Sequence, residues 1–477
     1  MTASPLAPER LAHPDDANAL DPRVWPASAG RAASGALVIG GVSAPALHAA
    51  YGTPLYVIDE TDVRARAARI RDAFAAAFAP LGVRTTVYYA GKAFLSIEVA
   101  RWMAEEGLSL DVCSGGELAV AEAADLDPRR LGFHGNNKSL AEIDHAVEIG
   151  LGTIVIDSLA EIERVAQAAE RHGRRQNVRL RINSGVHAST HEYLATARED
   201  QKFGIPLADA ADAVARIRSH SSLRFLGLHS HIGSQIFESG GFLEAARRLL
   251  ELHATLLEGG EVPELNIGGG FGIAYTSADE VAPIETIAAD FAEVIGSECA
   301  RLGIPVPAIA IEPGRAIIGP AGITLYEVGT IKDVLVEGAA VRRYVSVDGG
   351  MSDNLRTALY HADYTARLAN RVTDADPALV RVAGKHCESG DIVVRDEYLP
   401  GDVRPGDLLA VAATGAYCWS LSSNYNYLGR PAVVAVRDGG SRVLIRRENA
   451  HDLLRRDSGY SSGAEEIDID TILDREH

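Results

Sequence analysis

Short runs of β-branched, aromatic and other apolar residues recur through the middle of the chain, separated by segments with a helical pattern. Eight such runs occur at residues 85–90, 108–113, 131–135, 153–157, 178–182, 225–231, 264–267 and 308–312. Between them, segments such as 96–106 and 158–171 place Ala, Leu, Ile and Val on a 3.6-residue period, with charged residues on the other side. Eight strands alternating with helices over roughly 230 residues are typical of a (β/α)8 TIM barrel, so we predict this α/β fold.

After the last of these runs the pattern changes to short Val- and Ile-rich runs split by Gly, Pro and Asp, which is typical of an antiparallel sheet. The runs lie at 322–331, 341–348, 379–383, 391–395, 408–412, 431–437 and 441–446. Two earlier runs, 36–39 and 55–58, precede the barrel and can join the same sheet. We therefore predict a poorly ordered N-terminal extension (1–34), strands of the β-domain (35–60), the barrel (61–319), the antiparallel β-domain (320–450) and a polar acidic tail (451–477).

The composition is that of a water-soluble globular protein with two domains, since the 477 residues are 47% hydrophobic but only 6% aromatic. The formal net charge of -19 argues against nucleic acid and anionic membranes as partners. The four cysteines are too widely spaced for a disulfide framework, and the sequence shows no signal peptide and no apolar stretch as long as a membrane span. We expect a cytoplasmic protein.

Polar residues and glycines gather at the predicted carboxyl ends of the strands, where TIM barrels keep their reactive groups. In chain order these are Lys92, Asp111, His134 with Asn136, Asp157, Arg181, His231, Gly268 to Gly270, and Glu312 with Arg315. A random arrangement would scatter charged groups over both ends of the strands, so the pattern predicts a catalytic site. Asp157 is the exception, because an Asp before Ser158 is favoured as a helix cap.

Lys92 follows an apolar strand and is one of five lysines among 46 basic residues. Unlike arginine, a lysine amine can lose its proton and form an imine. Taken alone, Lys92 could equally be a lone surface residue. Gly268, Gly269 and Gly270 follow the seventh strand, where backbone N–H groups can bind phosphate, and Gly314 and Arg315 follow the eighth. An amine and a phosphate site together favour pyridoxal 5'-phosphate, a phosphorylated aldehyde.

Glu312 has a role in such a site, because a carboxylate facing the pyridine nitrogen keeps that nitrogen protonated and the ring electron-withdrawing. His231 could stack on the ring. His229 and His231 point to the same side of one strand, so a metal pair is the alternative. No third ligand is evident nearby in the sequence, and we expect no metal.

Several motifs carry a resemblance to a known family. They are residues 88–92, 111–118, 227–235, 268–272, 312–315, 387–391 and 415–417. In content and order they resemble the fold-type III pyridoxal phosphate decarboxylases, which have an alanine-racemase-like barrel, and among these most of all the diaminopimelate decarboxylases. The resemblance covers roughly residues 35 to 450.

The resemblance implies a role for each motif residue. The catalytic residues would be Lys92, as the Schiff-base lysine, Cys387, which protonates the reacting carbon, and His231, which stacks on the ring. The cofactor would also contact Asp111, Ser234, Gly268, Gly269, Gly270, Glu312, Gly314, Arg315 and Tyr417, with Glu117 and Arg181 in support. The substrate would contact Arg315, Arg356, Tyr360, Glu388 and Tyr417. Cys387 and Glu388 would enter the site of the other subunit of a homodimer.

The same resemblance implies decarboxylation of meso-2,6-diaminopimelate to L-lysine and CO2, the last step of lysine biosynthesis. Arg356 would take the distal carboxylate and Glu388 the distal ammonium of this substrate. Two alternatives remain: a decarboxylase of ornithine, arginine or carboxynorspermidine, which Arg356 and Glu388 disfavour, and a non-catalytic homologue, which the presence of Lys92 and Cys387 disfavours. Arg356 could also form only a surface ion pair.

Overall fold

The computed structural model describes residues 4–186, 202–231, 233–237, 240–336 and 340–460. The chain forms two compact units. The barrel unit comprises residues 64–273 and 280–317, and the sheet unit comprises residues 1–63, 274–279 and 318–477. The short segment 274–279 belongs to the sheet unit although it lies between two barrel elements in the sequence.

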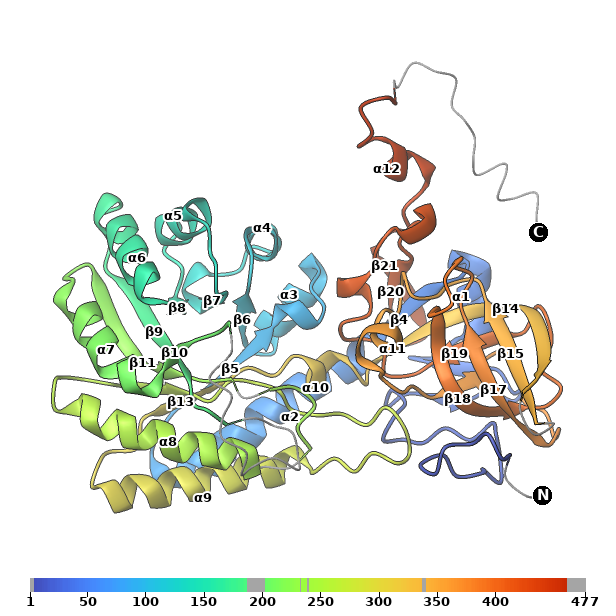
Figure 1. Cartoon of the computed structure of the whole chain (residues 1–477), viewed down its shortest axis with the longest axis horizontal. Helices are drawn as coiled ribbons and strands as arrows, with labels where there is room; N and C mark the ends of the chain where they lie inside the picture. The colour runs from blue at the N-terminus through green and yellow to red at the C-terminus, as the bar shows by residue number, and fades with distance from the viewer. Residues whose placement is uncertain (1–3, 187–201, 232, 238–239, 337–339, 461–477) are drawn as a thin grey trace. The chain divides into compact units, whose positions relative to one another are not determined.

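Eight parallel strands close into a ring in the barrel unit (Figure 1). They are β5 (Thr85–Ala90), β6 (Ser109–Val112), β7 (Leu131–Phe133), β8 (Thr153–Ile156), β9 (Gln176–Asn183), β11 (Leu223–His229), β12 (Glu264–Asn266) and β13 (Ala308–Ile311). The ring closes because β13 pairs with β5 and β9 pairs with both β8 and β11. All four residues of β8 are buried, as expected for a parallel strand covered on both faces. The predicted barrel is confirmed.

Helices before and between the barrel strands cover the outside of the ring (Figure 1). They are α2 (Glu60–Phe78), α3 (Ile97–Glu105), α4 (Gly115–Ala123), α5 (Leu140–Glu148), α6 (Leu159–Arg171), α7 (Ala210–Ser219), α8 (Gly240–Leu257) and α9 (Ile284–Leu302). The side chains of Ser96, Ser114 and Ser139 cap α3, α4 and α5 by accepting a backbone N–H bond.

The capping role that the sequence favoured for Asp157 is wrong. Ser158 occupies the N-cap position of α6. The carboxylate of Asp157 instead accepts a hydrogen bond from the Gly204 N–H at 2.9 Å and lies 3.7 Å from Arg181 Nη1. These partners come from distant parts of the chain, so a local preference for caps could not reveal them.

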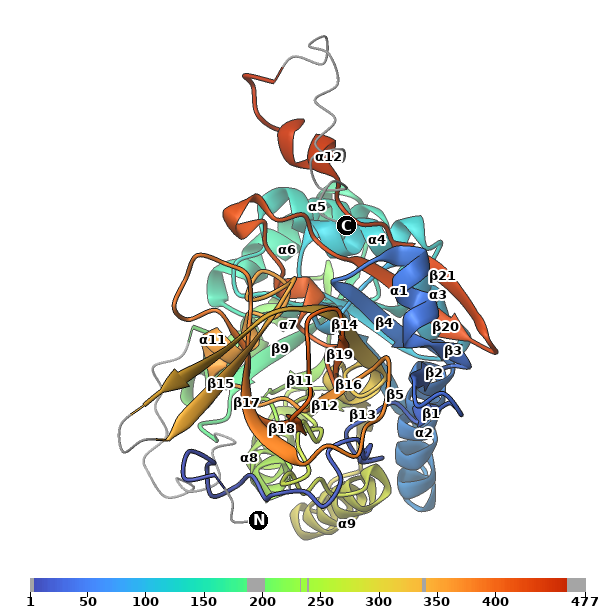
Figure 2. The same ribbon diagram turned by 90° about the vertical axis from the view of Figure 1, so that its right-hand side faces the viewer.

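The sheet unit is built on a nine-stranded sheet (Figure 2). Its strands are β4 (Leu55–Asp59), β14 (Gly322–Leu335), β15 (Val341–Val347), β16 (Ala366–Leu368), β17 (Pro377–Ala383), β18 (Ile392–Pro400), β19 (Leu408–Val411), β20 (Ala432–Arg437) and β21 (Gly440–Ile445). Most neighbours are antiparallel, but β15 pairs with β17 and β20 pairs with β4 in parallel. The early strand β4 lies between β14 and β20, so the sheet does take a strand from the N-terminal side.

The other early run does not enter this sheet. Residues Leu37–Ile39 form β2, which pairs with β1 (Gly30–Arg31) and β3 (Val42–Ser43) in a separate small sheet ahead of α1 (Ala44–Tyr51). Val24 and Trp25 are buried, so this part of the N-terminal extension is packed although the sequence predicted poor order. Its irregular turns carry no periodic pattern by which packing could be recognised.

The predicted tail begins with the short helix α12 (Ala450–Leu454), and its residues 461–477 lie outside the described part of the chain. Two further short helices, α10 (Arg315–Ile318) and α11 (Arg356–Tyr360), carry candidate site residues. Within the described residues, no helix combines the length and the apolar character needed to cross a membrane.

Candidate active site

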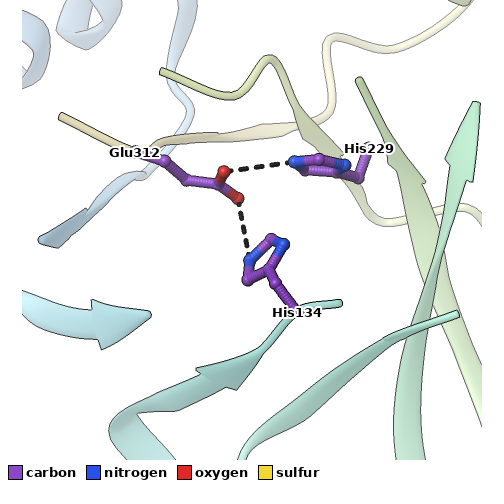
Figure 3. Close-up of side chains that lie close together, drawn as sticks. All are labelled: His134, His229 and Glu312. Atoms are coloured by element: carbon purple, nitrogen blue, oxygen red, sulfur yellow. Dashed lines mark hydrogen bonds and ion pairs between the residues drawn. The ribbon is translucent and has the colours of Figure 1, made fainter. Parts of the chain in front are cut away.

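A buried group of polar side chains lies at the carboxyl ends of the barrel strands (Figure 3). We call Asp111, His134, His229, Asn266 and Glu312 the barrel cluster. Glu312 is its centre: its Oε2 lies 3.1 Å from His229 Nε2, and its Oε1 accepts a 2.6 Å hydrogen bond from Asn266 Nδ2. His134 Nε2 lies 3.3 Å from the same Oε1. Donors from three different strand ends therefore hold one carboxylate.

Asp111, in β6, is the second carboxylate of the barrel cluster. Its Oδ1 lies 3.2 Å from His134 Nε2, the atom that also faces Glu312. Apart from this contact with His134, neither oxygen of Asp111 has a hydrogen-bond partner among the described residues, and the side chain is buried. Since a buried carboxylate with so few partners is costly, this part of the barrel suits a further cationic donor.

The charges of the barrel cluster divide unequally. Burial raises the pKa of Glu312, but His134 and His229 outweigh it and hold that pKa well below its usual value. Burial lowers the pKa of His134, but Glu312 and Asp111 outweigh it and raise that pKa to about 9. Burial and the charge of Glu312 raise the pKa of Asp111 to about 6, while burial lowers the pKa of His229 to about 4. His134 is thus the cation of the cluster and His229 a neutral donor.

Side-chain atoms of His134, His229 and Glu312 lie within 4.8 Å of one another, and Glu312 joins the two imidazoles through the contacts given above. The metal pair considered from the sequence was His229 with His231. The structure instead gives His231 a different partner, because its Nδ1 accepts a 3.3 Å hydrogen bond from the Gly269 N–H.

Lys92 lies in a single 3-10 turn, Gly91–Ala93, directly after β5, and its side chain is exposed. Burial and then the positive charge of Lys92 lower the pKa of His231 well below its usual value. Burial raises the pKa of Glu117. Two groups oppose this rise: the Cys113 N–H, which donates to Glu117 Oε2 at 2.7 Å, and the charge of Lys92. The positive charge of this scarce amine therefore affects His231 and Glu117 at the strand ends.

The loops after β11, β12 and β13 converge too closely for side chains. A Cβ on Gly268 would lie 2.4 Å from the Ser230 carbonyl oxygen, and one on Gly269 would lie 2.0 Å from the Glu312 carbonyl oxygen. Arg315 Nη2 donates a 2.9 Å hydrogen bond to Ser234 Oγ, which joins the loops after β11 and β13. The result is a concentration of backbone amides, a guanidinium and a hydroxyl, the groups that bind phosphate in proteins.

The sheet unit holds a second buried group, which we call the arginine cluster: Tyr275, Arg356, Tyr364 and Tyr417. Arg356 is 6% exposed, and its Nη1 donates to the hydroxyls of Tyr275 at 2.5 Å and Tyr364 at 2.9 Å. Its guanidinium carbon lies 6.0 Å from the centre of the Tyr417 ring. In the part of the chain that the structure describes, no carboxylate lies within ion-pair distance of Arg356, so the alternative of a surface ion pair is wrong.

Cys387 and Glu388 are exposed in a loop of the sheet unit. The Asp391 carboxylate accepts the N–H groups of His386 at 2.7 Å and Met351 at 2.6 Å, and His386 Nε2 lies 2.8 Å from Ser352 Oγ. These bonds fix the cysteine loop to the segment that leads into α11. Tyr360 ends α11 and is 60% exposed.

The candidate residues therefore fall into two groups. The barrel unit holds Lys92, Asp111, Glu117, Arg181, His231, Ser234, Gly268, Gly269, Gly270, Glu312, Gly314 and Arg315, and the sheet unit holds Arg356, Tyr360, Cys387, Glu388 and Tyr417. Sequence reasoning did not assign roles to Asn266, Tyr275 or Tyr364. The sequence indicated His134 only through its position at the predicted end of the third strand.

Comparison with known proteins identifies the class of the chain. Residues 61–319 match the model of the pyridoxal binding domain of the pyridoxal-dependent decarboxylases. This match covers more than half of the chain, which is therefore a pyridoxal-dependent decarboxylase.

Individual relatives narrow the class. The diaminopimelate decarboxylase of Mycobacterium tuberculosis is 53% identical over 443 residues, covering 91% of this chain and 98% of the relative. That of Corynebacterium efficiens is 48% identical over 444 residues, covering 92% and 95%. The crystal structure of diaminopimelate decarboxylase from M. jannaschii with L-lysine matches with a TM-score of 0.83 at 31% identity, over 91% of this chain and 98% of that one. The chain belongs to the diaminopimelate decarboxylase family.

Proposed function

We propose that this enzyme converts meso-2,6-diaminopimelate to L-lysine and CO2, the last step of lysine biosynthesis, with pyridoxal 5'-phosphate as its cofactor. Membership of the family supports the reaction. The observation that carries the choice of substrate is the buried Arg356 without a carboxylate partner among the described residues.

The residues of the barrel unit fit the cofactor. The buried Asp111 carboxylate and the ionised Glu312 suit a protonated ring nitrogen. The glycine loop 268–270, with Ser234, Gly314 and Arg315, would hold the phosphate, and His231 would lie against the ring. When bound, pyridoxal phosphate forms an imine with an amine and draws electrons away from the substrate carbon that loses its carboxylate.

The chain supplies the remaining steps. Lys92 would hold the cofactor through its Nζ. Glu312 would keep a proton on the ring nitrogen. The Cys387 thiol would supply the proton that replaces the lost carboxylate on the substrate carbon.

Recognition of the distal end of the substrate falls to the sheet unit. An arginine stays charged at every physiological pH, and its planar guanidinium can bind a carboxylate with two parallel hydrogen bonds. Arg356 would take the distal carboxylate, Glu388 the distal ammonium, and Tyr360 would add a hydroxyl. Ornithine has no distal carboxylate, which is why the arginine favours diaminopimelate.

We further propose a cytoplasmic homodimer in which Cys387 and Glu388 of one subunit complete the site of the other. Mixing inactive Lys92→Ala and Cys387→Ala proteins under exchange conditions should then restore about a quarter of the wild-type activity, since half of the dimers carry one intact site out of two. No recovery in the mixture would contradict shared sites.

The substrate is tested by measuring CO2 release from meso-diaminopimelate, L-ornithine and L-arginine in parallel, with L-lysine identified as product. We expect turnover of the first and little of the others. A preference for ornithine or arginine, or no turnover of any by cofactor-saturated protein, would overturn the proposal.

A further inference from the structure

His134 is the one described side chain that contacts both buried carboxylates of the barrel cluster. Its Nε2 lies 3.2 Å from Asp111 Oδ1. The same atom lies 3.3 Å from Glu312 Oε1, and Figure 3 shows this contact. The backbone holds the residue in place, because the His134 N–H donates to the Val112 carbonyl at 2.9 Å. The ring packs edge-on against His229, with 5.0 Å between centroids.

The position of His134 between the two carboxylates determines the protonation state of its imidazole ring. A lone pair on Nε2 would face two carboxylate oxygens at close range, so Nε2 must carry a hydrogen. A hydrogen on Nε2 alone leaves the ring neutral. The two carboxylates favour a second hydrogen, on Nδ1, because without a positive charge between them one of the carboxylates would take up a proton. His229 and Asn266 also donate to Glu312, but both are neutral, so neither supplies compensating charge.

We propose that His134 is a positioning residue that acts through Glu312: its imidazolium lies between Asp111 and Glu312 and keeps Glu312 charged and oriented for the ring nitrogen of the cofactor. This inference rests on the proposed function, which assigns that nitrogen to Glu312. The inference adds His134 to the proposed function as a residue that touches neither substrate nor cofactor. The electron-withdrawing state of the cofactor's pyridine ring would depend on His134.

The groups around His134 support this division of roles. Burial lowers the pKa of His134, but Glu312 and Asp111 outweigh burial and raise that pKa to about 9. The titratable side chains of His229 and Glu117 also interact with His134. The charge of Lys92 interacts with Glu117, and the charge of Arg181 interacts with Glu312 and His229. Other cations therefore also influence the carboxylates near His134. His134 is the cation within 3.3 Å of both Asp111 and Glu312.

The test uses the holoenzyme and the His134→Gln variant, in which the amide can still donate a hydrogen bond but has no charge. We expect the dissociation constant for pyridoxal phosphate to rise about tenfold or more near pH 7.5, because Glu312 shares the proton that the two carboxylates then hold. The wild-type affinity should fall as the pH rises through the His134 titration, and this fall should be absent in the variant. His145→Gln is the matched control, since His145 pairs with Glu122 on the exposed surface.

Asp111→Asn distinguishes a charge effect from a loss of shape. In the His134→Gln background it removes the second negative charge, so we expect most of the lost affinity to return. In the wild-type background it removes one of two carboxylate partners, so the pH at which affinity falls should move lower. This second measurement remains available if His134→Gln alone does not fold.

Three outcomes would overturn the inference: unchanged affinity and pH profile in His134→Gln, no recovery in the double variant, or no shift of the profile in Asp111→Asn. Failure of the proposed function looks different, because wild-type protein would then fail to bind pyridoxal phosphate or to release CO2 from diaminopimelate.

Discussion

The barrel cluster and the arginine cluster both bury charge, but they balance it in opposite ways. In the barrel cluster, two carboxylates surround one imidazolium, and neutral donors complete the shell of Glu312. In the arginine cluster, the described groups around the guanidinium are neutral phenols, with Tyr275 and Tyr364 bonded to one nitrogen. The first group contains charges of both signs, whereas the second, among the described residues, has a cation and no anion.

This difference separates two tasks. A compensated network keeps its members in one protonation state and one position, which suits a cofactor that stays bound through many turnovers. An uncompensated buried cation is costly until an anion arrives, so the free energy of pairing becomes available to select the substrate. We therefore expect changes in the barrel cluster to affect kcat and cofactor binding, and changes in the arginine cluster to affect mainly KM and substrate choice.

The largest expected effect is in the barrel cluster. Glu312→Gln keeps the size of the side chain but removes the charge, so kcat should fall about 1000-fold, on the order of 4 kcal/mol, with little change in KM. Steady-state rates with saturating cofactor measure this. Glu285→Gln, which removes a carboxylate paired with Arg69 on the surface, is the control. A Glu312→Gln enzyme with normal turnover would end the assignment of Glu312 to the ring nitrogen.

The second effect is on stability. The pKa of His134 is raised from 6.5 to about 9 in the folded state, so its contribution to stability is complete below pH 6.5 and is lost as the pH rises through 9. The pKa of His229 is lowered to about 4, so its contribution is lost only in acid. Urea unfolding of the cofactor-free protein should show up to about 3 kcal/mol less stability at pH 9.5 than at pH 6.5. His134→Gln should flatten this slope and His145→Gln should not, whereas equal slopes in all three proteins would contradict the charge assignment.

Most strands of the two units could be predicted from the sequence, although β16 was missed. The composition of the two clusters could not be predicted. Each barrel strand lies within a few residues of its predicted run, because alternation of apolar runs and amphipathic segments is a local property. The same local reasoning placed Lys92, Asp111, His134 and Glu312 at strand ends.

Which of these strand ends lie close together depends on the closure of the barrel. His134 and Glu312 meet because β13 pairs with β5, which brings the last strand beside the first. Tyr275 and Arg356 are 81 residues apart, and Tyr275 lies in a segment that the sequence placed in the barrel but that belongs to the sheet unit. No periodic pattern marks such a contact, so aromatic hydroxyls around a buried arginine could only be found in the structure.

The third effect is in the arginine cluster. Arg356→Met keeps the length of the side chain and removes the charge, so kcat/KM for diaminopimelate should fall about 50-fold, or about 2.3 kcal/mol, mainly through KM. Any residual turnover of L-ornithine should not fall with it. Arg343→Met, which breaks a surface pair with Asp333, should leave both rates unchanged. An equal loss with both substrates would mean that Arg356 supports the fold of the sheet unit and does not select the substrate.

The smallest effect concerns the phenols that hold the guanidinium. Tyr275→Phe removes a hydroxyl 2.5 Å from Arg356 Nη1 and leaves the bond from the same nitrogen to Tyr364. The charge remains, so only its orientation loosens, and KM for diaminopimelate should rise about fivefold, near 1 kcal/mol, with kcat unchanged. Tyr51→Phe, which removes a hydroxyl bonded to Ser441 elsewhere in the sheet unit, should not change KM. The double variant tests whether the tyrosine acts through the arginine. If Tyr275→Phe in the Arg356→Met background raises KM by the same factor again, the tyrosine acts independently of the arginine. We expect no further rise, because a hydroxyl that only orients the guanidinium has no effect once that charge is gone.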